Sequence, residues 1–316
     1  MDERRFVDFL ERKFPFRRGL GIGDDASVVR QGRTFQLVST DLLVEGVHFR
    51  VPDAPLSALA EKALAVNVSD IAAMGGRAQY FYLGLGFPSR LGAADRRGFF
   101  SGLSRACRRW DVELAGGDYS RSSQLLIAIT IVGESTRPVR RSGARAGDWL
   151  GITGPTGESA LGLKLLLAGE TRSPFIRRHQ HPRPQCEKGL RLSAHASAMI
   201  DVSDGLLLDL SRLLRASGVG AGVDYEKLPL APGFRRECQR RGFAERDLVL
   251  AGGEDYQLLF TVSPRQELRL RRTGTAYHLI GRISARRGLR LRENGRPLPV
   301  SRLGFDHFST GPGRNK

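Results

Sequence analysis

The chain has 316 residues, 41% of them hydrophobic, with 50 lysines and arginines against 33 aspartates and glutamates. This length favours two domains, and the hydrophobic content supports packed cores and argues against a disordered chain. The three cysteines are scattered without a CxxC pair, which argues against a disulfide framework or a zinc site and favours a reducing cytoplasm. The sequence shows no secretory signal and no stretch of the roughly 18 apolar residues that a membrane span needs, so we expect a cytoplasmic protein without membrane contact.

The formal net charge of +17 first suggests a nucleic-acid partner. The excess, however, consists mainly of arginines spread along the chain, such as the pairs at 96–97 and 240–241, without a long basic block. Basic and aromatic residues do not interleave as they do in RNA-reading surfaces. We therefore expect solvated helix faces and no nucleic acid, with a positive field that helps attract an anionic substrate.

The first half of the chain alternates predicted strands and helices. Phe99, Leu103, Ala106 and Trp110 step by four, three and four residues, which predicts an amphipathic helix. The predicted elements of this half are, in chain order, a strand at 34–39, a helix at 56–74, a strand at 78–87, a helix that includes 99–110 and a strand at 125–132.

The second half follows a joint at 137–147 that is rich in arginine and glycine. The predicted elements are a strand at 148–153, a helix at 157–169, a loop at 171–188, a strand at 198–202, a helix from 206 to a stop at Gly218, and strands at 256–262 and 276–283 on either side of a helix at 264–273. Strands and helices mix in both halves, so the sequence predicts an α/β or α+β fold.

Seven aspartates stand at the ends of apolar segments, where strands give way to loops or helices. They are Asp24, Asp25, Asp41, Asp70, Asp118, Asp201 and Asp204. Carboxylates at such positions can converge on one cleft, and they repel each other unless cations hold them together. Oxygen ligands suit Mg²⁺, which commonly bridges to substrate phosphates. The pattern therefore predicts a site that handles phosphate through metal ions.

Each acidic motif also has an ordinary structural interpretation. The Gly-rich stretch 21–26 fits a surface turn, and so does the Gly-Gly-Asp that ends at Asp118. Asp70 and Asp204 each follow a serine and could cap a helix. Successive side chains of 39–41 alternate between the faces of a strand, so their three oxygens reach one ion only if the backbone turns there.

The remaining local signals narrow the chemistry. Asp201 and Asp204 form a dense acidic pair with Ser203 between them, but the twelve-residue calcium-loop pattern is missing. His48 follows Asp41 by seven residues and is either a substrate contact or a structural histidine. The sequence contains no P-loop lysine motif, no protein-kinase set and no Gly-x-Ser-x-Gly elbow, so a nucleotide would be bound by another scheme.

Nine stretches of the chain follow the order of motifs in a known family. They are GIGDDA (21–26), VSTDLLVEGVHF (38–49), KALAVNVSDIAAMGG (62–76), LAGGD (114–118), RSGARAGDWLGITG (141–154), IDVSDGLLLDL (200–210), LAGGEDYQLLFTV (250–262), IGRI (280–283) and GFDHF (304–308). Together they resemble the thiamine-monophosphate kinase family, of the aminoimidazole-ribonucleotide-synthetase-like (PurM-like) superfamily. The Val-His-Phe after Ser-Thr-Asp and the final Gly-Phe-Asp-His-Phe indicate the thiamine enzyme among these relatives.

The resemblance implies a two-domain PurM-like α/β (α+β) fold, with an N-terminal domain at 1–137 and a C-terminal α/β domain at 147–310. It implies a homodimer in which strands of the N-terminal domains meet across the dimer axis as a β-barrel, with ATP in the cleft. It also implies the reaction ATP + thiamine phosphate → ADP + thiamine diphosphate, with several Mg²⁺ ions and with thiamine monophosphate and ATP as partners.

The resemblance also assigns the site residues, motif by motif. The implied metal ligands are Asp25, Ser39, Thr40, Asp41, Asp70, Asp118, Asp201 and Asp204. The implied ATP contacts are Gly117, Asp118, Arg141 and Ser203, and the implied thiamine phosphate contacts are His48, Glu254 and Phe305. The family often has two threonines after the Gly-Gly-Asp, whereas this chain has Tyr119-Ser120, which puts hydroxyl contacts there in question. Phe305 is aromatic but lacks a hydrogen-bonding tip, and core packing is its structural alternative.

The chemistry of the reactants agrees with this residue set. The acceptor is itself a phosphate with a second pKa of about 6, so it needs no dedicated base and no Ser–His pair. The obstacle is repulsion, since two charges about 4 Å apart interact by about 4 kcal/mol at moderate effective dielectric. Mg²⁺ ions and Arg141 can cancel it and permit an in-line transfer. We therefore expect direct transfer without a phosphoenzyme and without a dedicated catalytic side chain.

Two alternatives stay open on the sequence. One is a sister enzyme of the same superfamily, an aminoimidazole-ribonucleotide synthetase or a selenophosphate synthetase. The selenium enzyme would be favoured by a Cys–Lys pair near the N-terminus, and no cysteine precedes Cys107 in this sequence. The other is a nonenzymatic basic protein whose DNA binding depends steeply on salt.

Overall fold

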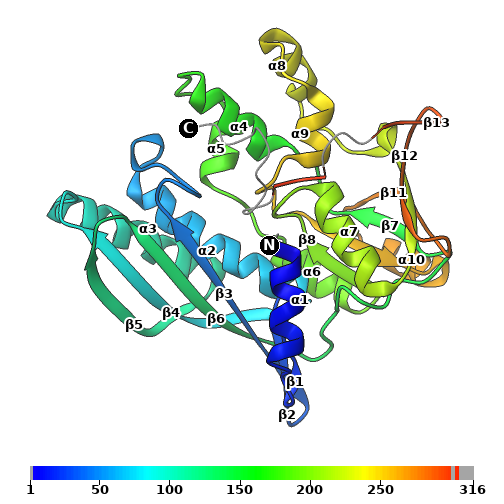
Figure 1. Cartoon of the computed structure of the whole chain (residues 1–316), viewed down its shortest axis with the longest axis horizontal. Helices are drawn as coiled ribbons and strands as arrows, with labels where there is room; N and C mark the ends of the chain where they lie inside the picture. The colour runs from blue at the N-terminus through cyan, green and yellow to red at the C-terminus, as the bar shows by residue number, and fades with distance from the viewer. Residues whose placement is uncertain (1–2, 300–302, 306–316) are drawn as a thin grey trace.

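Two mixed β-sheets, one in each half of the chain, organise the fold of this protein (Figure 1). The computed structural model describes residues 3–299 and 303–305. Helices pack on both sheets, which confirms the predicted two-domain α/β class. Among these residues, no helix is both long and apolar enough to cross a membrane.

The first half begins with a helix, after which the strands of its sheet alternate along the chain with two long helices. Its elements are α1 (Glu3–Lys13), β1 (Gly19–Leu20), β2 (Ser27–Gln31), β3 (Thr34–Val44), a short 3-10 helix (Val51–Asp53), α2 (Leu56–Ala73), β4 (Arg77–Pro88), α3 (Ala93–Trp110), β5 (Glu113–Ser122) and β6 (Leu126–Ser135). The strand order is β1-β2-β3-β6-β4-β5, and only the β4–β5 pair is parallel.

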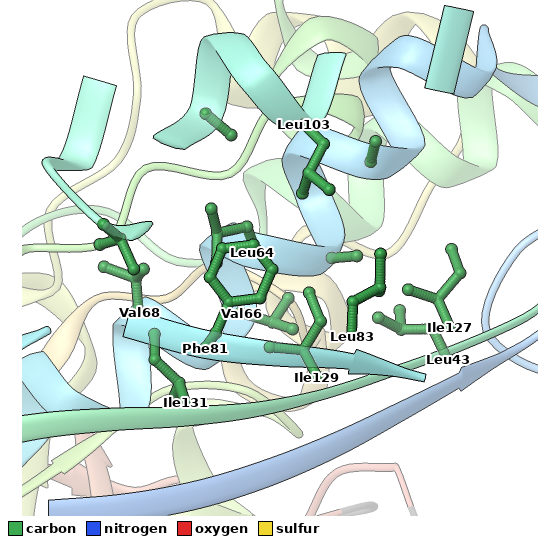
Figure 2. Close-up of a cluster of buried hydrophobic side chains, with 14 of the residues drawn as sticks. Leu43, Leu64, Val66, Val68, Phe81, Leu83, Leu103, Ile127, Ile129 and Ile131 are labelled. Carbon is green, nitrogen blue, oxygen red and sulfur yellow. The ribbon is translucent and has the colours of Figure 1, made fainter. Parts of the chain in front are cut away.

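The two faces of this sheet differ in polarity and cover. Helices α2 and α3 lie over one face (Figure 1), where Leu64, Phe81 and Ile129 belong to a buried hydrophobic cluster (Figure 2). Successive strand residues point to opposite faces. The other face therefore carries the alternate residues, among which Leu42 is 53% and Tyr82 45% exposed.

The second half contains a larger sheet surrounded by shorter helices. Its elements are β7 (Trp149–Ile152), α4 (Glu158–Leu167), α5 (Pro174–Gln180), α6 (Cys186–Ser193), β8 (Ala198–Asp201), α7 (Leu206–Ser217), β9 (Gly220–Asp224), a 3-10 helix (Tyr225–Lys227), α8 (Phe234–Arg241), α9 (Glu245–Ala251), β10 (Leu258–Val262), α10 (Pro264–Arg271), β11 (His278–Ser284), β12 (Gly288–Glu293) and β13 (Arg296–Pro297). The strand order is β13-β12-β9-β11-β7-β10-β8.

Helix α2 joins the two halves. It is rich in alanine and leucine and is buried along nearly its whole length, because it packs on β3, β4 and β6 and also on α6 and β8. Gly189 of α6 permits a close approach, since a Cβ there would lie 2.3 Å from the carbonyl oxygen of Ala72. A single helix thus carries side chains to the boundary between the halves.

Most predicted elements are confirmed to within a few residues. The strand predicted at 34–39 is longer, because Leu42, Leu43 and Val44 continue the ladder with β6, so Asp41 lies inside a strand. The loop predicted at 171–188 is wrong. Ser173 caps α5 by accepting a hydrogen bond from the Phe175 N–H at 3.2 Å, and buried apolar side chains anchor both α5 and α6.

The structure excludes the ordinary structural interpretations of two acidic residues. Asp70 is inside α2, as the predicted helix at 56–74 implies, so the alternative that it caps a helix is wrong. Asp118 lies within β5 rather than in a turn. Nearly every residue of this edge strand is exposed, so β5 lacks the apolar alternation that marks a half-buried strand.

Candidate functional site

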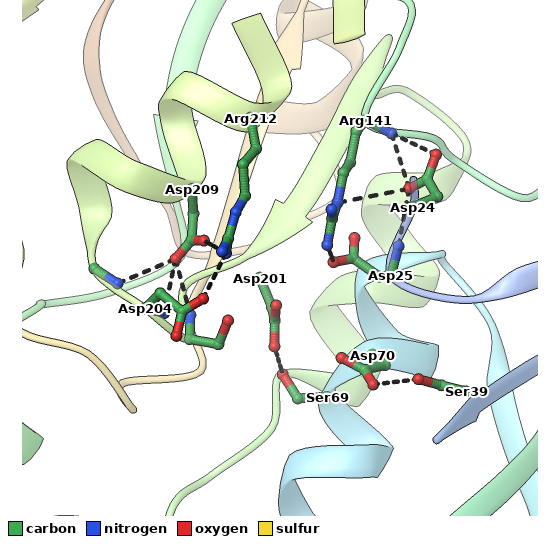
Figure 3. A network of polar contacts seen from close by, with 12 residues as sticks. Asp24, Asp25, Ser39, Ser69, Asp70, Arg141, Asp201, Asp204, Asp209 and Arg212 are labelled. Carbon is green, nitrogen blue, oxygen red and sulfur yellow. Dashed lines mark hydrogen bonds and ion pairs between the residues drawn. The ribbon is translucent and has the colours of Figure 1, made fainter. Parts of the chain in front are cut away.

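Three aspartates from distant parts of the chain meet at the boundary between the halves. Asp25 precedes β2, Asp70 lies in α2, and Asp201 ends β8. Each offers one carboxylate oxygen, and these oxygens lie within 4.8 Å of one another (Figure 3). The predicted convergence of acidic side chains from both halves is therefore present in the structure for these three residues.

Neighbouring hydroxyls and one unpartnered oxygen define this cluster. Ser39 Oγ donates to Asp70 Oδ2 at 2.5 Å, and Ser69 Oγ donates to Asp201 Oδ2 at 2.6 Å (Figure 3). Asp25 Oδ2 is buried and has no hydrogen-bond partner among the described residues. A buried carboxylate oxygen without a donor costs free energy, which a cation ligated there would offset. The donor set is all oxygen, as hard divalent ions prefer.

Burial and mutual repulsion raise the pKa of Asp70 and Asp201 in this cluster and of nearby Asp41. Burial, followed by the charges of Asp41 and Asp201, raises the pKa of Asp70 well above its ordinary value. Burial and then Asp25 do the same to the pKa of Asp201. Burial, followed by Asp204 and Asp25, raises the pKa of Asp41 to about 6. The site therefore favours either protons or a bound cation, and a divalent ion satisfies several carboxylates at once.

Arg141 connects the Gly-rich turn to the joint between the halves. Its Nη2 donates to Asp25 Oδ1 at 2.5 Å, and its backbone N–H lies 3.1 Å from both carboxylate oxygens of Asp24. Burial opposes the charged guanidinium, but the charges of Asp25 and Asp24 raise the pKa of Arg141 further above its ordinary value. A permanent cation thus borders the carboxylates, where an anionic ligand would meet it.

The loop that carries Ser203 and Asp204 is held by two residues of α7 that sequence analysis missed. Asp209 Oδ2 accepts hydrogen bonds from the N–H groups of Ser203, Asp204 and Gly205 at 3.1, 3.0 and 3.2 Å. Arg212 Nη1 donates to Asp209 Oδ1 at 2.7 Å and to Asp204 Oδ2 at 2.6 Å (Figure 3). The sequence signal that could have indicated Asp209 is an aspartate in the first turn of a helix that follows a Ser-Asp-Gly loop.

A second polar group lies where α2 meets the segment between α9 and β10. Lys62 Nζ is 2.6 Å from Glu254 Oε1, and His179 Nδ1 is 3.3 Å from Glu254 Oε2. His48 Nδ1 accepts the Val44 N–H at 3.1 Å, and its charge contributes to the electrostatic environment of Glu254. The structure thus brings His48 and Glu254 into one neighbourhood.

Phe305 lies beside the loop at 203–205. Its N–H donates to the carbonyl oxygen of Asp204 at 2.9 Å, and its side chain is 43% exposed. Position 304 requires a glycine, because the Cβ of any other residue would lie 2.5 Å from the same carbonyl oxygen. The rest of the predicted Gly-Phe-Asp-His-Phe motif, from residue 306, lies outside the described residues.

The structure does not bring Thr40 and Asp118 into the carboxylate cluster. Thr40 shares a 2.9 Å hydrogen bond with Thr130 on the sheet face opposite to α2. Strand register pairs Asp118 with Gly84, which places it on that same face. Gly117 has φ +151° and leaves no room for a side chain, since a Cβ would lie 1.9 Å from the carbonyl oxygen of Leu83.

His179 gives a testable dependence of stability on pH. Burial, followed by the charge of Lys62, lowers the pKa of His179 from 6.5 to about 4, although Glu254 opposes the change. Between these pH values His179 binds more protons in the unfolded chain than in the folded protein. The stability that depends on a neutral His179 is therefore complete above pH 6.5 and is lost as the pH falls. We expect His179→Gln to reduce this loss by up to about 3 kcal/mol. Urea unfolding of both proteins across that range measures it, and a constant difference would contradict the expectation.

Comparisons with known proteins agree with the geometry. The family model described as "AIR synthase related protein, N-terminal domain" matches residues 23–135, and "AIR synthase related protein, C-terminal domain" matches residues 145–294. The chain is similar to thiamine-monophosphate kinase of Aquifex aeolicus (strain VF5), at 39% identity over 76% of this chain and 80% of that protein. It is also similar to thiamine-monophosphate kinase of Salmonella typhimurium (strain LT2), at 38% identity over 92% of both chains.

A solved structure shows the same architecture at full length. The structure named "AaThiL complexed with AMPPCP and TMP" matches with a TM-score of 0.89 and 33% sequence identity, over 97% of both chains. The similarity therefore covers both halves and the boundary at which the carboxylates meet. On these grounds, this chain belongs to the thiamine-monophosphate kinase family.

Proposed function

We propose that this protein transfers the γ-phosphoryl group of ATP to thiamine monophosphate and forms thiamine diphosphate and ADP. The observation that carries the proposal is the meeting of Asp25, Asp70 and Asp201, from both halves, beside the permanently charged Arg141. Relatives named thiamine-monophosphate kinase, and the related structure complexed with AMPPCP and TMP, support the same reaction. Both reactants are polyanions, and this arrangement of charges suits them.

The residues of the cluster fit bound magnesium. Their oxygens lie within 4.8 Å of one another, and the buried, unpartnered Asp25 Oδ2 has the character of a ligand atom. Magnesium, when bound, neutralises phosphate charge and orients an in-line transfer. The proposed ligands are Asp25, Ser39, Thr40, Asp41, Asp70, Asp118, Asp201 and Asp204. Thr40 and Asp118 lie on the other sheet face, so they would serve a separate ion.

The chain's own groups bind and orient the nucleotide in this proposal. Arg141 supplies a fixed positive charge for the phosphates, and Ser203 lies in the loop held by Asp209. Gly117 and Asp118 offer backbone and carboxylate from β5. No side chain need take a proton from the acceptor phosphate, because its second pKa is about 6. We therefore propose direct transfer, with catalysis by position and charge.

The acceptor side comprises His48, Glu254 and Phe305 in this proposal. Glu254 offers a carboxylate to the cationic thiamine moiety, and the half-exposed ring of Phe305 offers a stacking surface. Phe305 hydrogen-bonds to Asp204 through its backbone, so the acceptor side adjoins the proposed nucleotide side. This adjacency is what transfer between two bound phosphates requires.

A side-by-side assay tests the function. The protein is incubated with Mg²⁺ and γ-labelled ATP, and with thiamine monophosphate, thiamine or an aminoimidazole precursor. We expect label in thiamine diphosphate only, and no labelled protein after rapid quenching. Turnover with the aminoimidazole precursor would instead support the sister-enzyme alternative, and a labelled protein intermediate would contradict direct transfer. DNA binding without ATP turnover would support the nonenzymatic alternative.

We also propose a homodimer that forms through the sheet of the first half, with domains at 1–137 and 147–310 and a cytoplasmic location. Strand β5 is an edge strand whose residues are nearly all exposed, including Leu114 at 49% and Tyr119 at 52%. Exposed edge strands are usually covered or charged, because they pair with other chains. A second copy would cover this strand and the open face that carries Tyr82.

Leu114→Glu should prevent this dimer. A charge on this edge strand disfavours pairing with a second copy. We expect monomers for the variant and dimers for the wild type in sedimentation velocity experiments. Leu268→Glu is the matched control, because Leu268 is 61% exposed on α10 of the other half. Identical dimers for wild type and Leu114→Glu would exclude β5 from the interface.

A further inference from the structure

Two residues beside the proposed acceptor site have a strained backbone. Among the described residues, four non-glycine residues have positive φ, namely Asp111, Glu254, Tyr256 and Asn294. Asp111 is the C-cap of α3, and Asn294 forms the two-residue turn between β12 and β13. Glu254 (φ +64°) and Tyr256 (φ +51°) have no such explanation. Strain of this kind persists where the surroundings impose it, and it clusters at functional sites.

Hydrogen bonds within the second half, and the packing of Tyr256 against the first half, impose this strain. The Glu254 N–H donates to the Ser203 carbonyl oxygen at 2.7 Å, and the Tyr256 N–H donates to that of Val202 at 2.9 Å. Tyr256 is only 7% exposed and belongs to the hydrophobic core of the first half. Asp255, between them, turns the other way and accepts the N–H groups of Gly157 and Ser159 at 2.5 and 3.1 Å. The segment therefore directs Glu254 toward α2.

Lys62 of α2 meets Glu254 at this point. The residue is only 4% exposed, and its Nζ lies 2.6 Å from Glu254 Oε1. Burial would raise the pKa of Glu254, but above all the charge of Lys62 reverses this and lowers it below the ordinary value. Glu254 is thus an ionised carboxylate in a half-buried setting. Buried lysines are rare unless they are paired, so the Lys62–Glu254 ion pair is a specific feature of the boundary.

We propose that Lys62 is a positioning residue for the acceptor, which fixes the Glu254 carboxylate across the domain boundary in the orientation that receives thiamine monophosphate. The inference rests on the proposed function, in which Glu254 contacts the acceptor. Thiamine monophosphate carries a thiazolium cation and an amino group on its pyrimidine ring, and both are partners for an ionised carboxylate. Lys62 acts only through Glu254, so its loss affects the acceptor and leaves the nucleotide contacts in place.

Steady-state kinetics with both substrates test the proposal. We expect Lys62→Met to raise the KM for thiamine monophosphate on the order of tenfold, while the KM for ATP changes by less than about twofold. Lys62→Arg keeps a cation beside Glu254 and should restore most of the acceptor affinity. The double variant Lys62→Met/Glu254→Gln should have the same acceptor KM as Glu254→Gln, because both changes remove the same Lys62–Glu254 interaction. This variant also leaves no unpaired buried charge, so it serves if Lys62→Met does not fold.

Glu61→Gln is the matched control for the boundary itself. Glu61 is the neighbour of Lys62 on α2, and its Oε2 lies 3.1 Å from His181 Nδ1 of the other half. We expect unchanged KM values in this variant. Lower stability of Lys62→Met with both KM values unchanged would overturn the proposal and leave Lys62 a purely structural role. Additive effects of Lys62→Met and Glu254→Gln would overturn action through Glu254. Absence of thiamine monophosphate turnover in the wild type would instead reject the proposed function.

Discussion

Replacing Asp70 with asparagine is expected to lower turnover by about a hundredfold or more while the fold stays intact. The asparagine side chain has the same shape and could still accept the hydrogen bond from Ser39, but the change removes one negative charge from the cluster with Asp25 and Asp201. Burial and neighbouring carboxyls raise the pKa of Asp70 well above its usual range, so its ionised form destabilises the ion-free protein at neutral pH. The variant should therefore be at least as stable as the wild type without divalent ions.

Two measurements on the same samples separate these effects. One is turnover with saturating Mg²⁺, ATP and thiamine monophosphate, and the other is thermal unfolding in a chelator. Asp224→Asn is the control, because Asp224 pairs with Lys227 at the surface and lies outside the site. Wild-type turnover in Asp70→Asn would remove Asp70 from the site. A large fall in the unfolding temperature would show that Asp70 serves the fold.

Replacing Asp209 with alanine is expected to lower the free energy of unfolding by about 3–5 kcal/mol. Asp209 is fully buried, and its loss would leave the N–H groups of Ser203, Asp204 and Gly205 without their acceptor. It would also remove one of the two carboxylates that Arg212 joins. Chemical denaturation measures the change, and a loss below about 1 kcal/mol would contradict this account.

Asp209→Asn separates the hydrogen bonds from the charge. Its amide oxygen can still accept N–H groups of the loop, whereas the negative charge beside Arg212 is gone. We expect a smaller loss of stability and a raised KM for ATP, because the loop positions Ser203 and Asp204 on the proposed nucleotide side. Equal destabilisation by alanine and asparagine would show that the charge, and not the hydrogen bonds, holds the loop.

The sequence predicted the carboxylate cluster, and it also predicted the helix of Asp70 and the strand of Asp201. Asp25, Asp70 and Asp201 stood out because acidic side chains in apolar surroundings require a reason. The role of Asp70 within its helix was less predictable. Asp70 follows Ser69 in a way that resembles a cap, but the surrounding alanines and leucines extend the helix past it. The local capping pattern is overridden because α2 packs against both halves of the molecule. A single sequence does not display such packing.

The contacts that position the site were not predictable from spacing. Lys62 and Glu254 are far apart in sequence, and their pairing depends on how α2 packs against the second half. Strand β5 escaped prediction for a related reason, because an exposed edge strand has no buried face to create a pattern. Its Gly-Gly-Asp therefore resembled a turn, although Gly117 is required by close strand contact rather than by reversal of the chain.

Helix α2 and Tyr256 link the cores of the two halves. Tyr256 from the second half completes the core of the first, and Ala73 of α2 belongs to a core that otherwise comes from the joint and the second half. Neither half can melt without exposing apolar surface of the other, so we expect heat denaturation to proceed as one transition. Genetic separation of the halves would consequently yield two fragments that aggregate, even though each contains a complete sheet.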